Sequence, residues 1–127
     1  MNRATESKYY ETVLYHLVYS ELVSAARHQG LTTYQYIAEI MGLKPSGNLM
    51  GRETGEIIGA ISANEVFHNR PMLSAVVVNT QGVPGGGLYD WAEKLGVYDP
   101  DAFGDEKEFW HEELKRVYET WRREYRA

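Results

Sequence analysis

The sequence predicts a mainly α-helical domain with a small β element, in the element order of a winged helix-turn-helix. Three observations support this prediction. A long amphipathic segment opens the chain, two further helical segments follow across a turn and a loop, and an apolar run rich in β-branched residues then leads into a glycine-rich wing. In domains of this type the helix after the turn commonly enters the major groove of DNA.

The first predicted helix covers residues 5–28. Its apolar side chains, among them Leu14, Leu17 and Val18, recur at three- and four-residue spacing and alternate with charged or polar ones. This spacing is typical of a helix that buries one face and exposes the other. Gly30 marks the end of the segment.

The second predicted helix begins at a capping box in residues 32–35, which read Thr-Thr-Tyr-Gln. The Thr32 hydroxyl can accept a hydrogen bond from the Gln35 amide while the Gln35 side chain reaches back. We expect this helix to stop at Gly42 and a loop to follow over residues 44–48.

The third predicted helix covers about residues 52–63 and turns three isoleucines toward the interior. It contains Gly55 and Gly59, each of which lowers helix stability by about 1 kcal/mol relative to alanine. Two explanations remain open: another part of the chain packs closely against these glycines, or a ligand approaches them.

A short apolar run over residues 72–79 predicts a buried strand, because it is rich in β-branched residues and bounded by turn formers. The glycine run at residues 85–87 permits positive φ and close approach of a ligand. It lacks the lysine and the serine or threonine of the nucleotide-binding P-loop. A short helix is then expected over residues 88–95, ended by Gly96.

The last predicted helix follows a linker, covers residues 105–126 and is capped by Asp105, with Glu108 three residues later. Acidic residues fill its first half and basic residues its second half, which matches the helix dipole. Its apolar stripe consists of Phe109, Trp110, Leu114, Val117, Tyr118 and Trp121. We expect this helix to pack on a winged-helix-like core formed by residues 30–96, within one domain spanning residues 1–127.

Composition and charge exclude several functions. The 127 residues contain no cysteine, so the chain has no disulfide, no thiolate metal site and no cysteine nucleophile. The 13 Lys and Arg residues are outnumbered by 18 Asp and Glu residues, and the net charge of −5 argues against non-specific coating of phosphate backbones. No segment resembles a signal peptide or a membrane span, so we expect a cytoplasmic protein without a membrane partner.

The region expected to form the helix-turn-helix is itself acidic. Over residues 31–69 the two bases are Lys44 and Arg52, against four glutamates, for a net charge of −2. Because most hydrogen bonds in protein–DNA interfaces go to phosphate and sugar, this balance argues against ordinary sequence-specific duplex binding.

Three motifs within residues 30–89 resemble those of a known family. Residues 31–38, LTTYQYIA, are similar to a Thr/Ser-Tyr-x-x-Leu/Ile-Ala motif, and residues 56–64, EIIGAISAN, to an Arg-Ala-Val-Gly-x-Ala-x-x-x-Asn motif. Residues 73–78, LSAVVV, stand where the family has Pro-Cys-His-Arg-Val-Val. Residues 85–89, GGGLY, stand where it has a glycine-rich loop with a tyrosine. Together they resemble the C-terminal domain of the alkylguanine-DNA alkyltransferases and of their non-enzymatic relatives, the alkyltransferase-like proteins.

The departures from this family fall on its chemistry. Ser74 or a neighbour stands at the position of the family's cysteine, and Ala75 and Val76 replace its His-Arg pair. Gly55 lies near the place of its finger arginine. Alkyl transfer is therefore not expected.

Nucleic-acid recognition is what the resemblance still implies. Tyr34 and Asn64 match the family's DNA-contact and pocket-supporting positions, and Tyr89 matches a residue that lines its base pocket. Extruding a base from a duplex costs a few kcal/mol, which stacking in an aromatic pocket partly repays. The alternative is that the fold persists while the site does not.

These observations define two sets of candidate residues and require no cofactor. The residues expected to contact nucleic acid are Tyr34, Gln35, Arg52, Asn64, Arg122, Arg123 and Arg126. The residues expected to line a base or nucleotide pocket are Ser74, Gly85, Gly86, Gly87 and Tyr89. The arginines near the C-terminus, with Trp121 and Tyr125, form the most electropositive surface that the sequence offers.

Two other functions remain open from the sequence. A protein-interaction module would use the aromatic and arginine-rich C-terminal helix, because Trp, Tyr and Arg are enriched at interface hot spots. A hydrolase would use Ser74 as nucleophile, His68 as base and Glu65 as orienting acid, although no Gly-x-Ser-x-Gly motif surrounds Ser74. The four histidines lie far apart in the sequence, and no metal site is expected.

Overall fold

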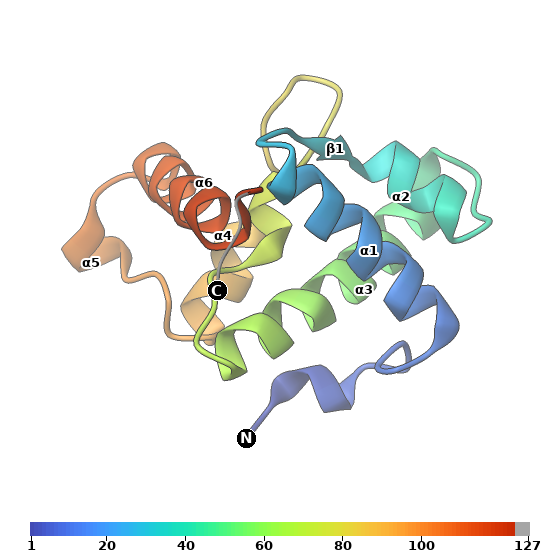
Figure 1. The fold of residues 1–127 in the computed structure, drawn as a ribbon, viewed down its shortest axis with the longest axis horizontal. Helices are drawn as coiled ribbons and strands as arrows, with labels where there is room; N and C mark the ends of the chain where they lie inside the picture. Colours follow the sequence, from blue (N-terminus) through green and yellow to red (C-terminus); the bar gives the residue numbers. More distant parts are fainter. Residues whose placement is uncertain (124–127) are drawn as a thin grey trace.

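The computed structural model describes residues 1–123, and most of them lie in helices (Figure 1). In chain order the elements are the 3-10 helix η1 (Arg3–Glu6), α1 (Val13–Arg27), β1 (Thr32–Thr33), α2 (Tyr34–Ile40), α3 (Gly47–Phe67), the 3-10 helix η2 (Leu73–Val76), β2 (Val77–Val78), α4 (Gly87–Lys94), α5 (Pro100–Phe103) and α6 (Glu106–Trp121). The prediction of a mainly helical chain with a small β element is confirmed. Within residues 1–123, no helix is long and apolar enough to cross a membrane.

The core forms where α1, α3 and α6 meet around η2. Its fully buried side chains include Leu22 from α1, Ile57 and Ile61 from α3, Leu73 from η2 and Val117 from α6. Burying an aliphatic side chain of this size contributes about 1.5–3 kcal/mol relative to leaving it exposed. In Figure 1, α1 and α3 occupy the centre, with α2 on one side and α4, α5 and α6 on the other.

A two-stranded parallel sheet joins the start of α2 to the segment that follows α3. Thr32 pairs with Val77, and Thr33 pairs with Val78. Because strand neighbours lie roughly 5 Å apart, this register holds the beginning of α2 close to the residues around Ser74.

The predicted strand over residues 72–79 is wrong for its first half, where the chain forms η2 instead. Tertiary partners satisfy the backbone there. The Met72 N–H donates to the Glu113 carboxylate at 2.9 Å, and the Ala75 carbonyl accepts from the Trp110 indole at 2.9 Å. Since α6 supplies both partners, these residues need no sheet ladder to satisfy their backbone groups.

The start of α1 differs from the prediction. The helix begins at Val13 rather than at residue 5. Glu11 has a φ of 62°, a left-handed conformation that no helix can contain. Thr12 then caps the helix, because its side chain accepts a hydrogen bond from the Tyr15 N–H.

The second and third helices also have different boundaries from those predicted. The cap of α2 is Thr33, whose hydroxyl accepts from the Tyr36 N–H at 3.1 Å, rather than the predicted Thr32, one residue earlier. α3 extends beyond the predicted residues 52–63 at both ends. Residues 47 and 48 have the composition of a loop, yet each residue added to an existing helix gains a hydrogen bond, so weak helix formers can join it.

The last part of the chain matches the prediction more closely. α4 begins and ends within one residue of the predicted 88–95, while the expected linker contains the short helix α5. The predicted cap of α6 is confirmed, because the Asp105 carboxylate accepts from the Glu108 N–H at 2.8 Å. The Tyr118 hydroxyl donates to the Gly30 carbonyl at 2.8 Å and holds α6 against the end of α1.

Candidate functional site

A cavity of about 510 Å³ lies between the N-terminal segment, α3 and the start of α4. This volume falls in the range of ligand sites, roughly 300–1,000 Å³. Its lining comes from five parts of the chain and consists of Arg3, Glu6, Ser7, Tyr34, Arg52, Gly55, Glu56, Ile58, Gly59, Ala60, Ser74, Gly87, Leu88 and Trp91. Four of the predicted site residues, Tyr34, Arg52, Ser74 and Gly87, are therefore brought together.

Trp91 forms one aromatic wall of the cavity. Its indole N–H donates to the Gly59 carbonyl at 2.8 Å, which fixes the ring against α3. A Cβ at position 59 would lie 3.6 Å from the indole nitrogen, so the glycine allows close packing there. At Gly55, which also lines the cavity, no atom of the described chain lies within 4 Å of such a Cβ. Close packing thus accounts for Gly59, whereas Gly55 borders open space in the cavity.

Tyr34 is the first residue of α2 and forms a second aromatic wall. Its hydroxyl accepts a hydrogen bond from the Gly85 N–H at 3.0 Å. A Cβ at position 85 would lie only 3.1 Å from that oxygen, so the glycine-rich loop comes close to the ring. Burial raises the pKa of Tyr34, and the phenol therefore stays neutral at physiological pH.

Ser74 supplies a polar group on the cavity wall. Its hydroxyl accepts from the Ser62 hydroxyl at 2.7 Å, and its backbone N–H donates to the same Ser62 oxygen at 3.0 Å. Both serines are buried. The Ser74 hydroxyl retains its own proton, which it can donate to a ligand.

The residues proposed for a hydrolase have other partners. His68 is exposed, and its Nδ1 lies 2.8 Å from the Asn64 carbonyl. The buried Glu65 carboxylate binds the Arg70 guanidinium at 2.9 and 2.8 Å and accepts from the Tyr19 hydroxyl at 3.4 Å. These contacts give Ser74 no base.

The N-terminal strap, defined as residues 2–9, lies along α3 at the lower edge of Figure 1. The Asn2 amide donates to the Asn64 side chain at 2.9 Å, and the Ser7 hydroxyl donates to the Glu56 carboxylate at 3.0 Å. Within the strap, Ala4 is completely buried. The strap forms one wall of the cavity through Arg3, Glu6 and Ser7.

Glu53 anchors the far end of the strap and organises the charges beside the cavity. Its carboxylate binds the Lys8 ammonium at 2.7 Å and the Arg52 guanidinium at 3.2 Å, and it accepts from the Tyr9 hydroxyl. The hydrogen bond from Lys8, followed by those from Tyr9 and Arg52, lowers the pKa of Glu53 to about 2. Burial and the bond to Glu53 raise the pKa of Tyr9 to about 12.

Several predicted residues lie outside the cavity lining. Asn64 binds the strap instead, and Tyr89 packs in an aromatic cluster with Tyr98 and Phe109 at ring-centre distances of 6.3 and 6.4 Å. Gln35 has a buried Oε1 with no hydrogen-bond partner in the described chain. Gly85 and Gly86 belong to the loop before α4 but do not line the cavity.

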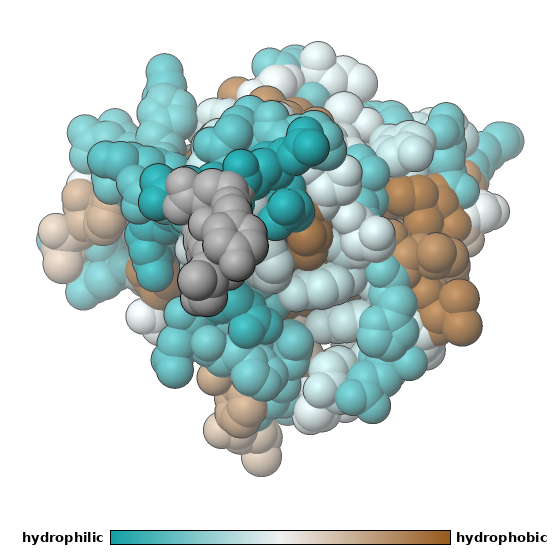
Figure 2. Space-filling model, in the orientation of Figure 1, coloured by the Kyte–Doolittle hydropathy of each residue, from teal (hydrophilic) through white to brown (hydrophobic). Residues whose placement is uncertain are grey.

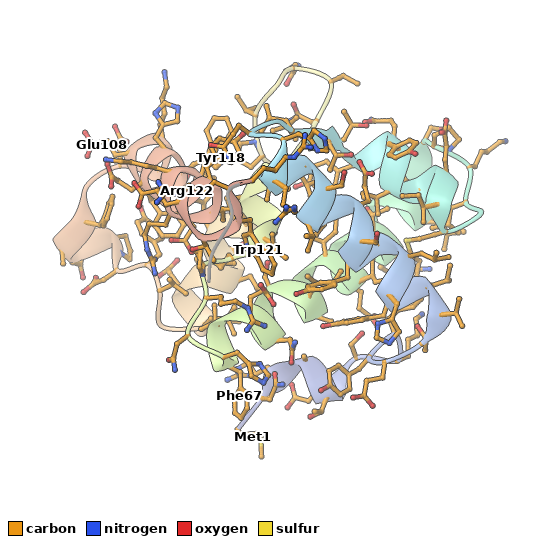
Figure 3. All side chains as sticks on the ribbon, viewed as in Figure 1. Met1, Phe67, Glu108, Tyr118, Trp121 and Arg122 are labelled. Atoms are coloured by element: carbon orange, nitrogen blue, oxygen red, sulfur yellow. The ribbon has the colours of Figure 1, made fainter. Side chains whose placement is uncertain are left out.

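The C-terminal helix uses its aromatic side for the core. Phe109 and Trp110 are buried, and Trp121 packs edge-on against Tyr19 of α1 at 6.4 Å (Figure 3). Phe109 and Trp110 thus lie in the apolar stripe as predicted, whereas Trp121, which was also assigned to an electropositive surface, is partly buried. The visible side of α6 is largely hydrophilic, whereas an apolar area lies at the opposite edge of the molecule, over α2 and the first turn of α1 (Figure 2).

The two described arginines of the predicted C-terminal basic group do not line the cavity. Arg122 and Arg123 follow the end of α6 and are not lining residues. Tyr125 and Arg126 lie outside the described residues. Within residues 1–123, no group of three His, Asp or Glu side chains is placed to hold a metal ion.

Sequence reasoning missed the strap and Trp91. Residues 2–9 carry no motif, and their role comes from long-range contacts with α3. Trp91 was detectable in principle, because it follows Leu88 by three residues on a short amphipathic helix and thus shares a face with it.

Comparison of the chain with family models, with curated proteins and with solved structures found no match. The geometry of the cavity and the residues around it therefore carry the functional argument.

Proposed function

We propose that this protein binds nucleic acid without catalysis, in the manner of an alkyltransferase-like winged-helix protein, and holds one base in the cavity. The observation that carries the proposal is the convergence of Tyr34, Arg52 and Ser74 on one cavity. These three residues come from separate segments: Tyr34 and Ser74 lie in motifs that resemble those of one family, and Arg52 is one of the two bases in residues 31–69. Trp91 adds an aromatic ring that the sequence did not single out.

The lining offers what a base with its attached phosphate requires. Stacking of one base on an aromatic side chain contributes about 1–3 kcal/mol, and Tyr34 and Trp91 both present rings to the cavity. The Arg52 side chain is 69% exposed and can reach a phosphate that lies outside the cavity. The Ser74 hydroxyl and the Glu56 carboxylate provide a donor and an acceptor for the edge of a base.

The absence of a catalytic role is supported by the sequence and by the surroundings of Ser74. The chain has no cysteine to accept an alkyl group. A serine nucleophile needs a base within hydrogen-bond reach, whereas the Ser74 hydroxyl is hydrogen-bonded to the neutral hydroxyl of Ser62. Recognition is thus the activity that the lining favours.

The winged-helix assignment is supported by the order of the elements. α1, α2 and α3 are followed by β2 and a glycine-rich loop, as in the predicted arrangement. The resemblance of residues 30–89 to the alkyltransferase-like proteins belongs to the same proposal.

A pair of matched variants tests the proposal. Gly51 and Gly55 are both exposed residues of α3 with open space around a Cβ, but only Gly55 lines the cavity. We expect Gly55→Leu to fill the cavity and weaken oligonucleotide binding by about tenfold or more, corresponding to loss of a base stack. Gly51→Leu should leave the affinity within about twofold of the wild type. It is a matched control, because both variants change the helix propensity of α3 by the same amount.

The measurement is fluorescence anisotropy of labelled DNA and RNA oligonucleotides at low salt. Circular dichroism of both variants confirms that each remains folded. Equal affinities for the two leucine variants would contradict binding in the cavity, and no binding by the wild-type protein would contradict the proposal as a whole.

A further inference from the structure

We infer that the nucleic acid held by this site is single-stranded, an inference that rests on the proposed function. Beyond its exposed first turns, the helix that would read a duplex, α3, presents almost no side chain to a groove. The charges and size of the cavity instead match one base with one or two phosphates.

Burial of α3 is the first argument. From Glu53 to Val66, Gly55 is the only exposed residue, and glycine has no side chain with which to contact a base edge. Ile57 and Ile61 face the core, where they are completely buried. A recognition helix needs several exposed side chains along one face to read base edges in the major groove.

The strap is the second argument. It covers α3 through contacts spaced along the helix, from Glu53 through Glu56 to Asn64. The major groove of B-DNA is about 12 Å wide, and a helix with its side chains already measures about 10–12 Å. With the strap bound to it, α3 is therefore too wide to enter the major groove.

The charges beside the cavity are the third argument. Arg3 and Arg52 line it, together with Glu6 and Glu56, and Lys8 lies at the same end of α3. Lys8 and Arg52 are both bound to the Glu53 carboxylate, which offsets part of their charge. Duplex-binding proteins commonly contact about 6–10 phosphates, whereas these cations suffice for about two.

The energy of base extrusion favours the same conclusion. A base in a duplex must lose its pairing and stacking before it can enter the cavity, at a cost of a few kcal/mol. A base in a single strand is already unpaired. An acidic protein with few phosphate contacts has little binding energy with which to offset that cost.

The test uses fluorescence anisotropy at several salt concentrations to compare a labelled DNA strand of about 12 nucleotides with the blunt-ended duplex formed from the same strand and its complement. We expect the single strand to bind at least about tenfold more tightly than the duplex. Its affinity should fall with salt with a log–log slope near −1.4, the value for about two phosphate contacts on a single strand.

Duplex binding of equal or higher affinity would overturn the inference while leaving the proposed function intact. Binding of neither ligand at low salt would overturn the proposed function itself. The two failures are therefore distinguishable in one experiment.

A cross-linked strap provides a second test. The chain has no cysteine, so Asn2→Cys with Asn64→Cys creates a unique pair that a short bis-maleimide can join. Neither position lines the cavity. We expect the cross-linked and the unlinked double variant to bind the single strand with affinities within about twofold. Loss of binding on cross-linking would show that the strap must leave α3, and would overturn the inference.

Discussion

The hydroxyl of Tyr34 accepts a hydrogen bond from the backbone N–H of Gly85 at 3.0 Å. This contact joins the first residue of α2 to the glycine-rich loop, across 51 positions of the sequence. Both residues were predicted to belong to the site, one as a nucleic-acid contact and one as part of the pocket. The loop is therefore held in place by a side chain that also lines the cavity.

Gly85→Ala is expected to destabilise this contact, with Gly86→Ala as its control. A methyl group at position 85 would lie 3.1 Å from the Tyr34 oxygen, so the loop or the ring must move. At position 86, φ is −59° and no atom of the described residues lies within 4 Å of the new Cβ.

Urea denaturation measures both variants. We expect Gly85→Ala to lower the free energy of unfolding by about 1–2 kcal/mol, the order of a lost buried hydrogen bond. Gly86→Ala should be neutral or more stable by up to about 1 kcal/mol. A Gly85→Ala protein as stable as its control would show that the loop does not depend on this contact.

The two buried serines give a second prediction. Ser62→Ala removes both hydrogen bonds of the pair and leaves the Ser74 N–H without its acceptor, at an expected cost of about 1–3 kcal/mol. Ser74→Ala removes only one bond and keeps its N–H paired, so its cost should be smaller. Thermal or urea unfolding ranks the two, and the opposite order would refute the assigned bonding.

Stability at acidic pH is expected to depend on Glu53. The pKa of this carboxyl is about 2 in the folded protein, below its ordinary value of 4.5. A lowered pKa means that the charged form stabilises the fold above the ordinary value, and that this contribution is lost as the pH falls through about 2. The stability difference between the wild type and Glu53→Gln should therefore be constant above about pH 5 and should shrink as the pH falls from 4.5 toward 2.

Acid titration of unfolding, with urea as the second variable, measures that difference. A stability difference that stays constant down to pH 2 would contradict the assigned hydrogen bonds between Glu53 and the strap.

Arg70 is expected to be required for the burial of Glu65. The Glu65 side chain is completely buried, and its two oxygens accept from Arg70. Arg70→Met leaves the carboxylate with the Tyr19 hydroxyl alone, at 3.4 Å, and should cost roughly 3 kcal/mol. The double variant Glu65→Leu with Arg70→Met should recover much of this stability, because it buries no unpaired charge. Wild-type stability of the single variant would refute the account.

The sequence allowed most helices to be predicted, since amphipathic spacing and caps such as Asp105 are local signals. It did not predict η2, because the partners of its backbone, Glu113 and Trp110, come from α6. The start of α1 was placed too early because apolar spacing continues through Tyr10, although Glu11 has a φ of 62° and the preceding Lys8 and Tyr9 bind Glu53 of α3.

The candidate site was predicted in part. Tyr34 and Ser74 belong to motifs that could be compared with a known family, and Arg52 is one of two bases in its region. Asn64 was assigned to recognition, but it binds Asn2, a contact between residues 62 positions apart that no local pattern reveals. The strap was missed for the same reason.

The indole N–H of Trp91 offers the most direct test of binding in the cavity. The chain has three tryptophans and therefore three indole signals in a ¹H–¹⁵N spectrum, and Trp91→Phe identifies the relevant one. On addition of a short single-stranded oligonucleotide, we predict that the Trp91 signal shifts while those of Trp110 and Trp121, which do not line the cavity, move little. A Trp91 signal that stays in place at saturating oligonucleotide, while other signals shift, would contradict the account.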